Sequence, residues 1–216
     1  MASKDLQLKL VERTVRVGGE EYRIEMVDDI DSLLAQLPQD AELPYWAILW
    51  ESAVALGEQM AERPELVQSQ SVLELGAGLG LCGMVAARLG GVVTQTDSAP
   101  SALEMCRSNA VRNGIEGIRV LQEDWRAWRL TELFDVVIAS DVAYERALHE
   151  PLMSAVEASL APWGVALFAD PWRDSGWEFA DKLLKGGWKL GLQSRKVCPT
   201  GDEVEVTLIE ARRGEI

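Results

Sequence analysis

Short apolar runs alternate with helical patterns along the chain from Ser71 onward. Each run is typical of a buried strand, and each is followed by apolar positions three and four residues apart, as in a helix packed on a core. Such alternation predicts an α/β fold with a mostly parallel sheet and helices on both faces. The predicted strands are Val72–Leu75, Val92–Thr96, Ile118–Gln122, Phe134–Ser140 and Val165–Ala169; the predicted helices are Leu81–Leu89, Ala99–Asn113, Arg146–Leu160 and Ser175–Lys185.

The C-terminal end breaks this alternation. Two strand patterns, Trp188–Cys198 and Glu203–Glu210, follow each other with only a turn containing Pro199 and Gly201 between them. Strands joined by a short turn pair in antiparallel fashion. We therefore expect a seven-stranded sheet that ends in an antiparallel hairpin, whereas a plain dinucleotide-binding fold would continue with a helix and a parallel strand.

The N-terminal part has its own pattern. Strand-like segments at Leu10–Val17 and Tyr22–Val27 flank two glycines, which is a hairpin signal. A short helix is expected over Asp29–Leu37, and a longer one over Glu51–Glu62 that ends before Pro64. We interpret residues 1–43 as an N-terminal extension and 44–216 as the main domain.

Composition and charge narrow the classes of function. The chain has 216 residues, is 48% hydrophobic and carries a net charge of −14. Nucleic-acid binding normally needs a basic patch, so we expect no nucleic-acid partner. The acidity suits a basic partner such as a lysine-bearing protein surface, although it also serves solubility. No apolar run is long enough to cross a membrane. The oligomeric state stays open.

The cysteines and the histidine add little chemistry. Cys82, Cys106 and Cys198 lack the paired spacing of a disulfide framework or a zinc site, and we expect no metal. Free cysteines and the absence of a signal-like N-terminus favour the cytoplasm. The only histidine, His149, is expected to be an exposed residue at a helix start.

The most informative segment runs from Glu74 to Gly80. A buried strand ends in an acid, and three glycines follow at alternate positions before a helix begins. Glycine permits positive φ and close approach of a ligand to the backbone. The free N–H groups of the helix start make the turn electropositive. This arrangement is typical of nucleotide-type cofactor sites.

Acids also follow the other predicted strands, at the sheet edge where ligands bind. Asp97 stands where an acid can accept hydrogen bonds from ribose hydroxyls, and it is equally suited to cap the next helix. Asp124 and Trp125 offer a carboxylate and an aromatic face that suit an adenine ring. Asp141 and Asp170 follow the fourth and fifth strands.

With these motifs the chain resembles the class I, Rossmann-like S-adenosylmethionine-dependent methyltransferases over residues 44–210. Glu74–Gly80 is similar to the first motif of that family, Asp97 to its ribose-binding acid and Asp124 to its adenine-contacting position. The resemblance implies S-adenosyl-L-methionine as cofactor and S-adenosyl-L-homocysteine as product. The implied cofactor-binding residues are Trp50, Glu74, Gly76, Ala77, Gly78, Gly80, Asp97, Ser98, Asp124, Trp125 and Ser140.

Two short segments carry a narrower resemblance. The stretch YWAILW at 45–50 and the D-x-x-Y pattern from Asp141 to Tyr144 resemble the protein-lysine methyltransferases, especially those acting on the β subunit of electron transfer flavoprotein. The resemblance implies a protein partner that bears a target lysine. It also implies that Asp141 orients the lysine amine and that Tyr144 walls the lysine channel, with a packing residue at a helix start as the lesser alternative for Tyr144.

Rival interpretations remain at this stage. Gly78, Gly80 and Gly83 fit the G-x-G-x-x-G pattern of nicotinamide enzymes. A small-molecule N- or O-methyltransferase is a second alternative, since Asp141 and Asp170 could hold Mg²⁺ under a catechol-like substrate. A nucleotide-cofactor-binding protein without methyl transfer is a third.

The tryptophans outside the predicted cofactor-binding set have weaker sequence signals. Trp46 is as well explained by the core as by the site, and Trp172 is expected to face the substrate cleft. We assign Trp163, Trp177 and Trp188 to structural roles.

Overall fold

The computed structural model describes residues 9–29, 34, 43–199 and 201–214. Most of the short helix predicted over Asp29–Leu37 lies outside these residues. The α-helices are α2 (Glu51–Glu62), α3 (Leu81–Arg88), α4 (Pro100–Arg112), α5 (His149–Ser159) and α6 (Asp174–Lys185). The strands are β1 (Leu10–Val17), β2 (Glu20–Val27), β3 (Ser71–Leu75), β4 (Val92–Asp97), β5 (Arg119–Gln122), β6 (Phe134–Ser140), β7 (Leu160–Asp170), β8 (Trp188–Val197) and β9 (Val204–Arg213).

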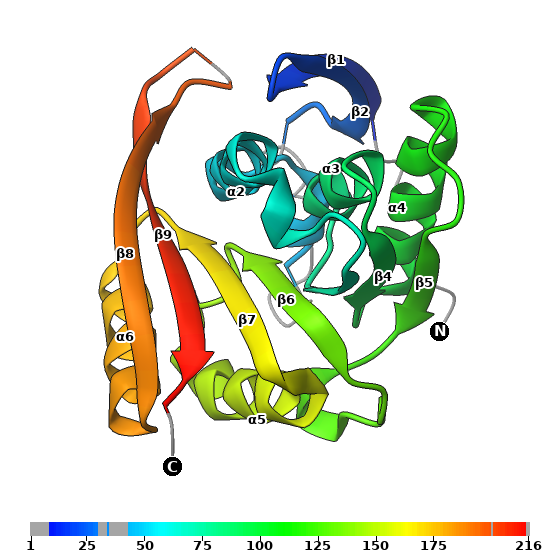
Figure 1. Cartoon of the computed structure of the whole chain (residues 1–216). Coiled ribbons are helices and arrows are strands. Elements are labelled where there is room, and N and C mark those ends of the chain that lie inside the picture. The colour runs from blue at the N-terminus through cyan, green and yellow to red at the C-terminus, as the bar shows by residue number, and fades with distance from the viewer. Residues whose placement is uncertain (1–8, 30–33, 35–42, 200, 215–216) are drawn as a thin grey trace, which may run out of the picture.

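One seven-stranded sheet forms the centre of the molecule, in the order β5-β4-β3-β6-β7-β9-β8 (Figure 1). Neighbours from β5 to β7 are parallel, whereas β9 is antiparallel to both β7 and β8. The predicted parallel sheet with an antiparallel hairpin at its end is confirmed. Because β4 and β6 lie on opposite sides of β3, the strand order reverses there, and the carboxyl ends of these strands border a crevice.

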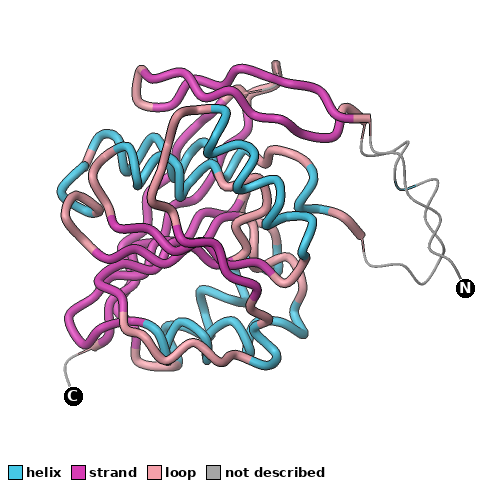
Figure 2. The backbone as a smooth tube through the Cα atoms, turned by 90° about the vertical axis from the view of Figure 1, so that its right-hand side faces the viewer, coloured by secondary structure: helices cyan, strands magenta, loops and turns pink. Residues whose placement is uncertain are grey.

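Alternating side chains of the central strands supply two separate cores. Val136, Ile138 and Leu167 face the layer of α2, α3 and α4, whereas Val137 and Phe168 face α5 and α6. This period of two is what a strand buried on both faces requires. Figure 2 shows the resulting layers edge-on, with the β1–β2 hairpin outside the helices of one face.

The N-terminal hairpin is fastened to α4 by long-range hydrogen bonds. Asn109 Oδ1 accepts from the Glu25 N–H at 2.8 Å, and Asn113 Oδ1 accepts from the Arg23 N–H at 2.8 Å. Apolar hairpin residues, Val17 and Ile24 among them, join the core on this face. The division into an extension and a main domain stays a prediction.

The boundary between α5 and β7 differs from the prediction. The helix ends at Ser159 and β7 begins at once, five residues before the predicted strand start. The register with β6 then jumps from Phe134↔Leu160 to Val136↔Val165, so the intervening residues bulge outward. Trp163 lies on this bulge and is 89% exposed, so it does not pack in the core.

No helix within the described residues has the length and apolar character needed to span a membrane.

Candidate active site

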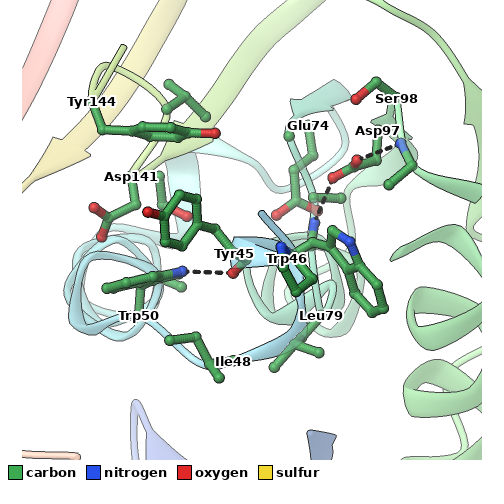
Figure 3. A pocket seen from close by; sticks show the side chains of 18 of the residues that line it. Tyr45, Trp46, Ile48, Trp50, Glu74, Leu79, Asp97, Ser98, Asp141 and Tyr144 are labelled. Atoms are coloured by element: carbon green, nitrogen blue, oxygen red, sulfur yellow. Dashed lines mark hydrogen bonds between the residues drawn. The ribbon is translucent and has the colours of Figure 1, made fainter. Parts of the chain in front are cut away.

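A cavity of about 1000 Å³ opens at the carboxyl ends of the central strands. Every residue predicted to bind the cofactor or to act in catalysis contributes to its lining: Trp50, Glu74, Gly76, Ala77, Gly78, Gly80, Asp97, Ser98, Asp124, Trp125, Ser140, Asp141 and Tyr144. The structure therefore brings together all of these residues, although their individual roles stay predictions. Figure 3 shows that the cavity has two ends. We name them the glycine end (Glu74–Gly80, Asp97 and Ser98) and the aromatic end (Tyr45, Trp50, Asp141 and Tyr144).

The backbone of the glycine end adopts conformations that favour glycine. Gly76, Gly78 and Gly80 have φ values of 65°, 53° and 82°, in the left-handed region. A Cβ on Gly76 would lie 2.9 Å from Val142 and 3.2 Å from Trp125, and one on Gly78 would lie 3.4 Å from the Trp46 carbonyl oxygen. A Cβ is thus too close to its neighbours at Gly76, and positive φ disfavours side chains at all three positions, so the turn presents bare backbone to the cavity.

Glu74 is a buried organiser of this turn. Its Oε2 accepts hydrogen bonds from the Gly83 N–H at 3.0 Å and from Gln95 Nε2 at 2.7 Å, which ties β3 to α3 and β4. Burial raises the pKa of Glu74 to about 7, although both hydrogen bonds oppose the shift.

Asp97 holds the glycine turn, but it is not the N-cap of α4, whose N-cap is Ala99. Asp97 Oδ1 accepts from the Ala99 N–H at 2.9 Å beside the start of α4, and its Oδ2 accepts from the Gly78 N–H at 3.0 Å (Figure 3). The same carboxylate lines the cavity. A carboxylate has about four acceptor positions, so holding the turn is compatible with binding a ligand hydroxyl.

Asp124 accepts hydrogen bonds from a neighbouring arginine, which the sequence does not predict. Its two oxygens form a bidentate pair with Arg126, with Nη2 at 2.8 Å, and these hydrogen bonds lower the pKa of Asp124. An adenine amine would share this acceptor with the guanidinium. Trp125 follows and covers Gly76, so its ring forms a wall of the cavity.

Aromatic rings from two distant segments meet at the aromatic end. The Tyr45 ring lies edge-on to Trp50, with centroids 6.1 Å apart, and to Tyr144, at 5.6 Å. Trp50 Nε1 donates to the Tyr45 carbonyl oxygen at 2.9 Å, which fixes the indole (Figure 3). Tyr45 belongs to the YWAILW stretch, but nothing in the sequence singled it out from its neighbours.

Asp141 is held in an unusual position beside these rings. It is 8% exposed, and its φ of 56° is in the left-handed region, which costs a non-glycine residue roughly 1–2 kcal/mol. Burial raises the pKa of Asp141, whereas Ser52 and the Arg173 guanidinium oppose that rise. Arg173 also lines the cavity and pairs with Asp141. No motif marks Arg173 in the sequence, and only its position after the fifth parallel strand points to this edge of the sheet.

Two predictions near this end were wrong. His149 does begin α5, but it is 1% exposed, because its ring packs on Phe179 and its Nε2 contacts the Ala143 carbonyl oxygen at 3.0 Å. Trp172 does not line the cavity; the centre of its ring lies 3.8 Å from that of Trp177, and Arg173 takes the predicted place.

The remaining tryptophans divide between core and surface. Trp188 is buried, in agreement with a structural role, whereas Trp177 is half exposed. Trp46 packs against the core and also lines the cavity.

The geometry does not favour a metal between the two strand-end acids. Asp141 and Asp170 both bind the Arg173 guanidinium, which fills the place that a cation would need. Within the described residues, no group of three or more histidine, cysteine or acidic side chains is arranged to hold a metal ion.

The sequence model of the lysine methyltransferase family matches residues 34–177, about two thirds of the chain. The chain belongs to the lysine methyltransferase family. Its relatives act on more than one kind of side chain. The histone-arginine methyltransferase METTL23 of Xenopus laevis is 29% identical over 83% of this chain and 80% of its own length. EEF1A lysine methyltransferase 3 of Mus musculus is 30% identical over 79% of this chain and 73% of its own length.

The electron transfer flavoprotein beta subunit lysine methyltransferase of Xenopus laevis is 31% identical over 60% of this chain. The chain spans about half the length of that relative, 53%. The resemblance to the D-x-x-Y group is confirmed at the level of the family, and the chain is an S-adenosylmethionine-dependent methyltransferase.

Solved structures confirm the fold. The Thermus thermophilus 16S rRNA methyltransferase RsmC, in complex with AdoMet and guanosine, has a TM-score of 0.65 at 20% identity over 96% of this chain and 51% of its own. The ribosomal protein L11 methylase of Lactobacillus delbrueckii has a TM-score of 0.62 at 17% identity, over 78% of this chain and 81% of its own. These neighbours are Rossmann-like methyltransferases, and the family sets the nicotinamide alternative aside.

Proposed function

We propose that the enzyme transfers a methyl group from S-adenosylmethionine to the Nζ atom of a lysine on a protein partner. The observation that carries this proposal is one cavity with bare backbone at one end and a buried carboxylate among aromatic rings at the other. The two ends suit the two partners of a transfer reaction, because the reacting atoms must be held in line and close together.

The residues of the glycine end fit the cofactor. The glycines present backbone without side chains to the cavity, Asp97 offers acceptors for ribose hydroxyls, and Trp125 offers a ring face for adenine. A volume of about 1000 Å³ is enough for a drug-sized ligand. When bound, S-adenosylmethionine supplies a methyl group activated on a sulfonium. The chain's own contribution is to bind, orient and exclude water.

The aromatic end would prepare the lysine amine. A lysine amine has a pKa near 10.4 in water and must be neutral to react. Burial among Tyr45, Trp50 and Tyr144 favours the neutral amine by desolvation. Asp141 would accept a hydrogen bond from an N–H of that amine and aim the nitrogen lone pair along the cavity. The ring faces would stabilise the positive charge that the nitrogen acquires.

A lysine fits this end better than an arginine. A guanidinium stays charged at all relevant pH values, and Asp141 is already paired with Arg173. A substrate guanidinium would bring a second cation to the same carboxylate. The family description also supports lysine, whereas the METTL23 relatives keep arginine as the alternative to test.

Labelled methyl transfer from S-adenosylmethionine is the direct test. The acceptors would be calmodulin, EEF1A, the electron transfer flavoprotein β subunit and histones, followed by a lysate of the source organism. We expect label in one protein, on lysine by mass spectrometry, with Asp174→Asn as the matched control for Asp141→Asn. Label on arginine would overturn the lysine assignment, and label only in small molecules would favour a metabolite methyltransferase.

We propose a cytoplasmic location as well, because Cys82, Cys106 and Cys198 are all free and such thiols suit a reducing compartment. Cell fractionation tests this, and recovery from an oxidising compartment would overturn it.

A further inference from the structure

Arg173 bridges the two carboxylates that follow β6 and β7. Its Nη2 donates to Asp170 Oδ2 at 2.8 Å and to Asp141 Oδ1, and its backbone N–H donates to Asp170 Oδ1 at 3.0 Å. Both aspartates are buried, at 3% and 8% exposure, whereas about a third of the Arg173 side chain is exposed. We name these three residues the arginine bridge.

The two carboxylates differ in what remains available on them. Both Asp170 oxygens accept hydrogen bonds from Arg173. Asp141 uses Oδ1 for Arg173, while its Oδ2 is buried and accepts no well-aligned hydrogen bond within the described part of the chain, although the Ser52 hydroxyl lies close enough to lower the pKa of Asp141. Asp141 lines the cavity and Asp170 does not. The bridge therefore has an anchoring carboxylate on one side and a carboxylate with a spare oxygen on the other.

A buried carboxylate without a cation tends to take up a proton. Burial raises the pKa of Asp141, the Asp170 charge raises it further, and Ser52 and Arg173 lower it. A protonated Asp141 would lose one of the acceptor positions that an amine needs. The guanidinium is planar and stays charged, so it can serve two carboxylates at fixed geometry.

We propose that Arg173 is a positioning residue for methyl transfer: it keeps Asp141 ionised and occupies Oδ1, which leaves Oδ2 as the acceptor for the substrate amine, while Asp170 anchors the guanidinium. This rests on the proposed function, because it gives Asp141 an amine to orient. Arg173 acts through Asp141 and needs no contact with either substrate.

The first test measures Asp141 directly and needs no substrate. Protein with ¹³C-labelled aspartate carboxyls would be titrated by NMR as wild type, Arg173→Gln and Arg173→Lys, with Asp141→Asn assigning the resonance. Arg146→Gln is the matched control, since Arg146 forms an exposed pair with Glu178 and does not line the cavity. We expect Asp141 to titrate at least about one pH unit higher in Arg173→Gln, with most of the shift restored in Arg173→Lys. An unchanged titration in Arg173→Gln would overturn the proposal.

The second test uses whichever protein acceptor the wild type methylates. We expect Arg173→Gln to lower kcat at least about tenfold and to move the acidic limb of the rate profile to higher pH, with KM for S-adenosylmethionine unchanged; Arg173→Lys should regain most of the rate. A wild-type kcat and profile in a folded Arg173→Gln would overturn the proposal. If the wild type methylates nothing, the proposed function fails, whereas the NMR result still decides whether Arg173 controls Asp141.

Discussion

The glycine end of the cavity is lined mostly by backbone, whereas the aromatic end is lined by side chains from distant parts of the chain. Gly76, Gly78 and Gly80 lie within one turn, and Asp97 reaches that turn across a single strand pair. Tyr45, Asp141 and Arg173 come from three segments that are far apart in sequence. One end is thus formed mainly by one local turn, and the other forms only when the segments around Tyr45, Asp141 and Arg173 come together.

This difference predicts how each end responds to substitution. A change in the glycine turn alters the shape of the backbone, so it should affect cofactor affinity or stability. A change at the aromatic end removes one side chain from an intact frame, so it should affect the rate or the affinity for the acceptor. The following predictions test that contrast, from the largest expected change in free energy to the smallest.

Asp141→Asn should have the largest effect. The amide cannot hold a negative charge opposite the amine, and we expect kcat to fall about a thousandfold, equivalent to about 4 kcal/mol. Binding of S-adenosylhomocysteine should stay within about threefold, since the glycine end is untouched. Single-turnover kinetics and calorimetry measure the two quantities. If Asp141→Asn lowered cofactor affinity as well as rate, the two ends of the cavity would not differ in the way described.

Glu74→Gln should change how stability depends on pH. The pKa of Glu74 is raised to about 7 in the folded protein from its ordinary value of 4.5. The contribution of Glu74 to the free energy of unfolding is therefore fully present below pH 4.5. It is lost as the pH rises through 7, and the loss amounts to about 3 kcal/mol. The amide of the variant does not titrate, so the difference in free energy of unfolding between variant and wild type should change by that amount from about pH 4.5 to about pH 8.

Urea unfolding at several pH values measures this difference. The exposed Glu116→Gln is the control and should leave the pH dependence as in the wild type. An equal pH dependence in Glu74→Gln and wild type would show that Glu74 is ionised in the folded state at little cost.

Gly78→Leu should weaken cofactor binding about a hundredfold, equivalent to about 2.7 kcal/mol. The new side chain meets the Trp46 backbone in the cavity, at a φ of 53°. Gly114→Leu is a matched control: its φ is 64°, but nothing lies within 4 Å of its Cβ. Both variants should lose roughly 1–2 kcal/mol of stability, and only Gly78→Leu should lose affinity for S-adenosylhomocysteine by calorimetry. Equal affinity in the two variants would contradict a cofactor role for the turn.

Tyr144→Ala should have the smallest effect. It removes a ring that contacts Tyr45 and is itself 41% exposed. We expect KM for the protein acceptor to rise about tenfold, about 1.4 kcal/mol, with KM for S-adenosylmethionine unchanged. Tyr144→Phe keeps the ring and should stay within about threefold of the wild type. A large loss in Tyr144→Phe would instead assign the chemistry to the hydroxyl.

The fold could be predicted from the sequence because its signals are local. Alternation of strand and helix patterns, and the missing helix before β9, define the sheet order in a family of this topology. The β7 start was missed because the bulge after Leu160 depends on pairing with β6, which no local pattern records. His149 was misjudged for a similar reason, since its burial depends on Phe179 of another helix.

The candidate site divides in the same way. The glycine turn and the acids at strand ends are visible as motifs, and all of them except Asp170 line the cavity. The places of Arg173 and Tyr45 in the site are known only from the structure. Arg173 pairs with Asp141, about 30 residues away, and Tyr45 contacts Tyr144, about 100 residues away. The sequence predicts that Asp141 orients the amine, and it offers Asp141 and Asp170 as metal ligands only in the small-molecule alternative; it does not reveal that Arg173 joins them.

The bonds between the hairpin and α4 have a consequence for synthesis on the ribosome. Glu25 bonds to Asn109, which is 84 residues later in the chain. At about 5–20 residues per second, the hairpin waits for α4 for roughly 4–17 s after it has been made. An isolated two-stranded hairpin is marginal in water, so nascent β1–β2 spends these seconds without its partner α4. That interval is when the chain is most open to chaperones and to pairing with a neighbouring nascent chain.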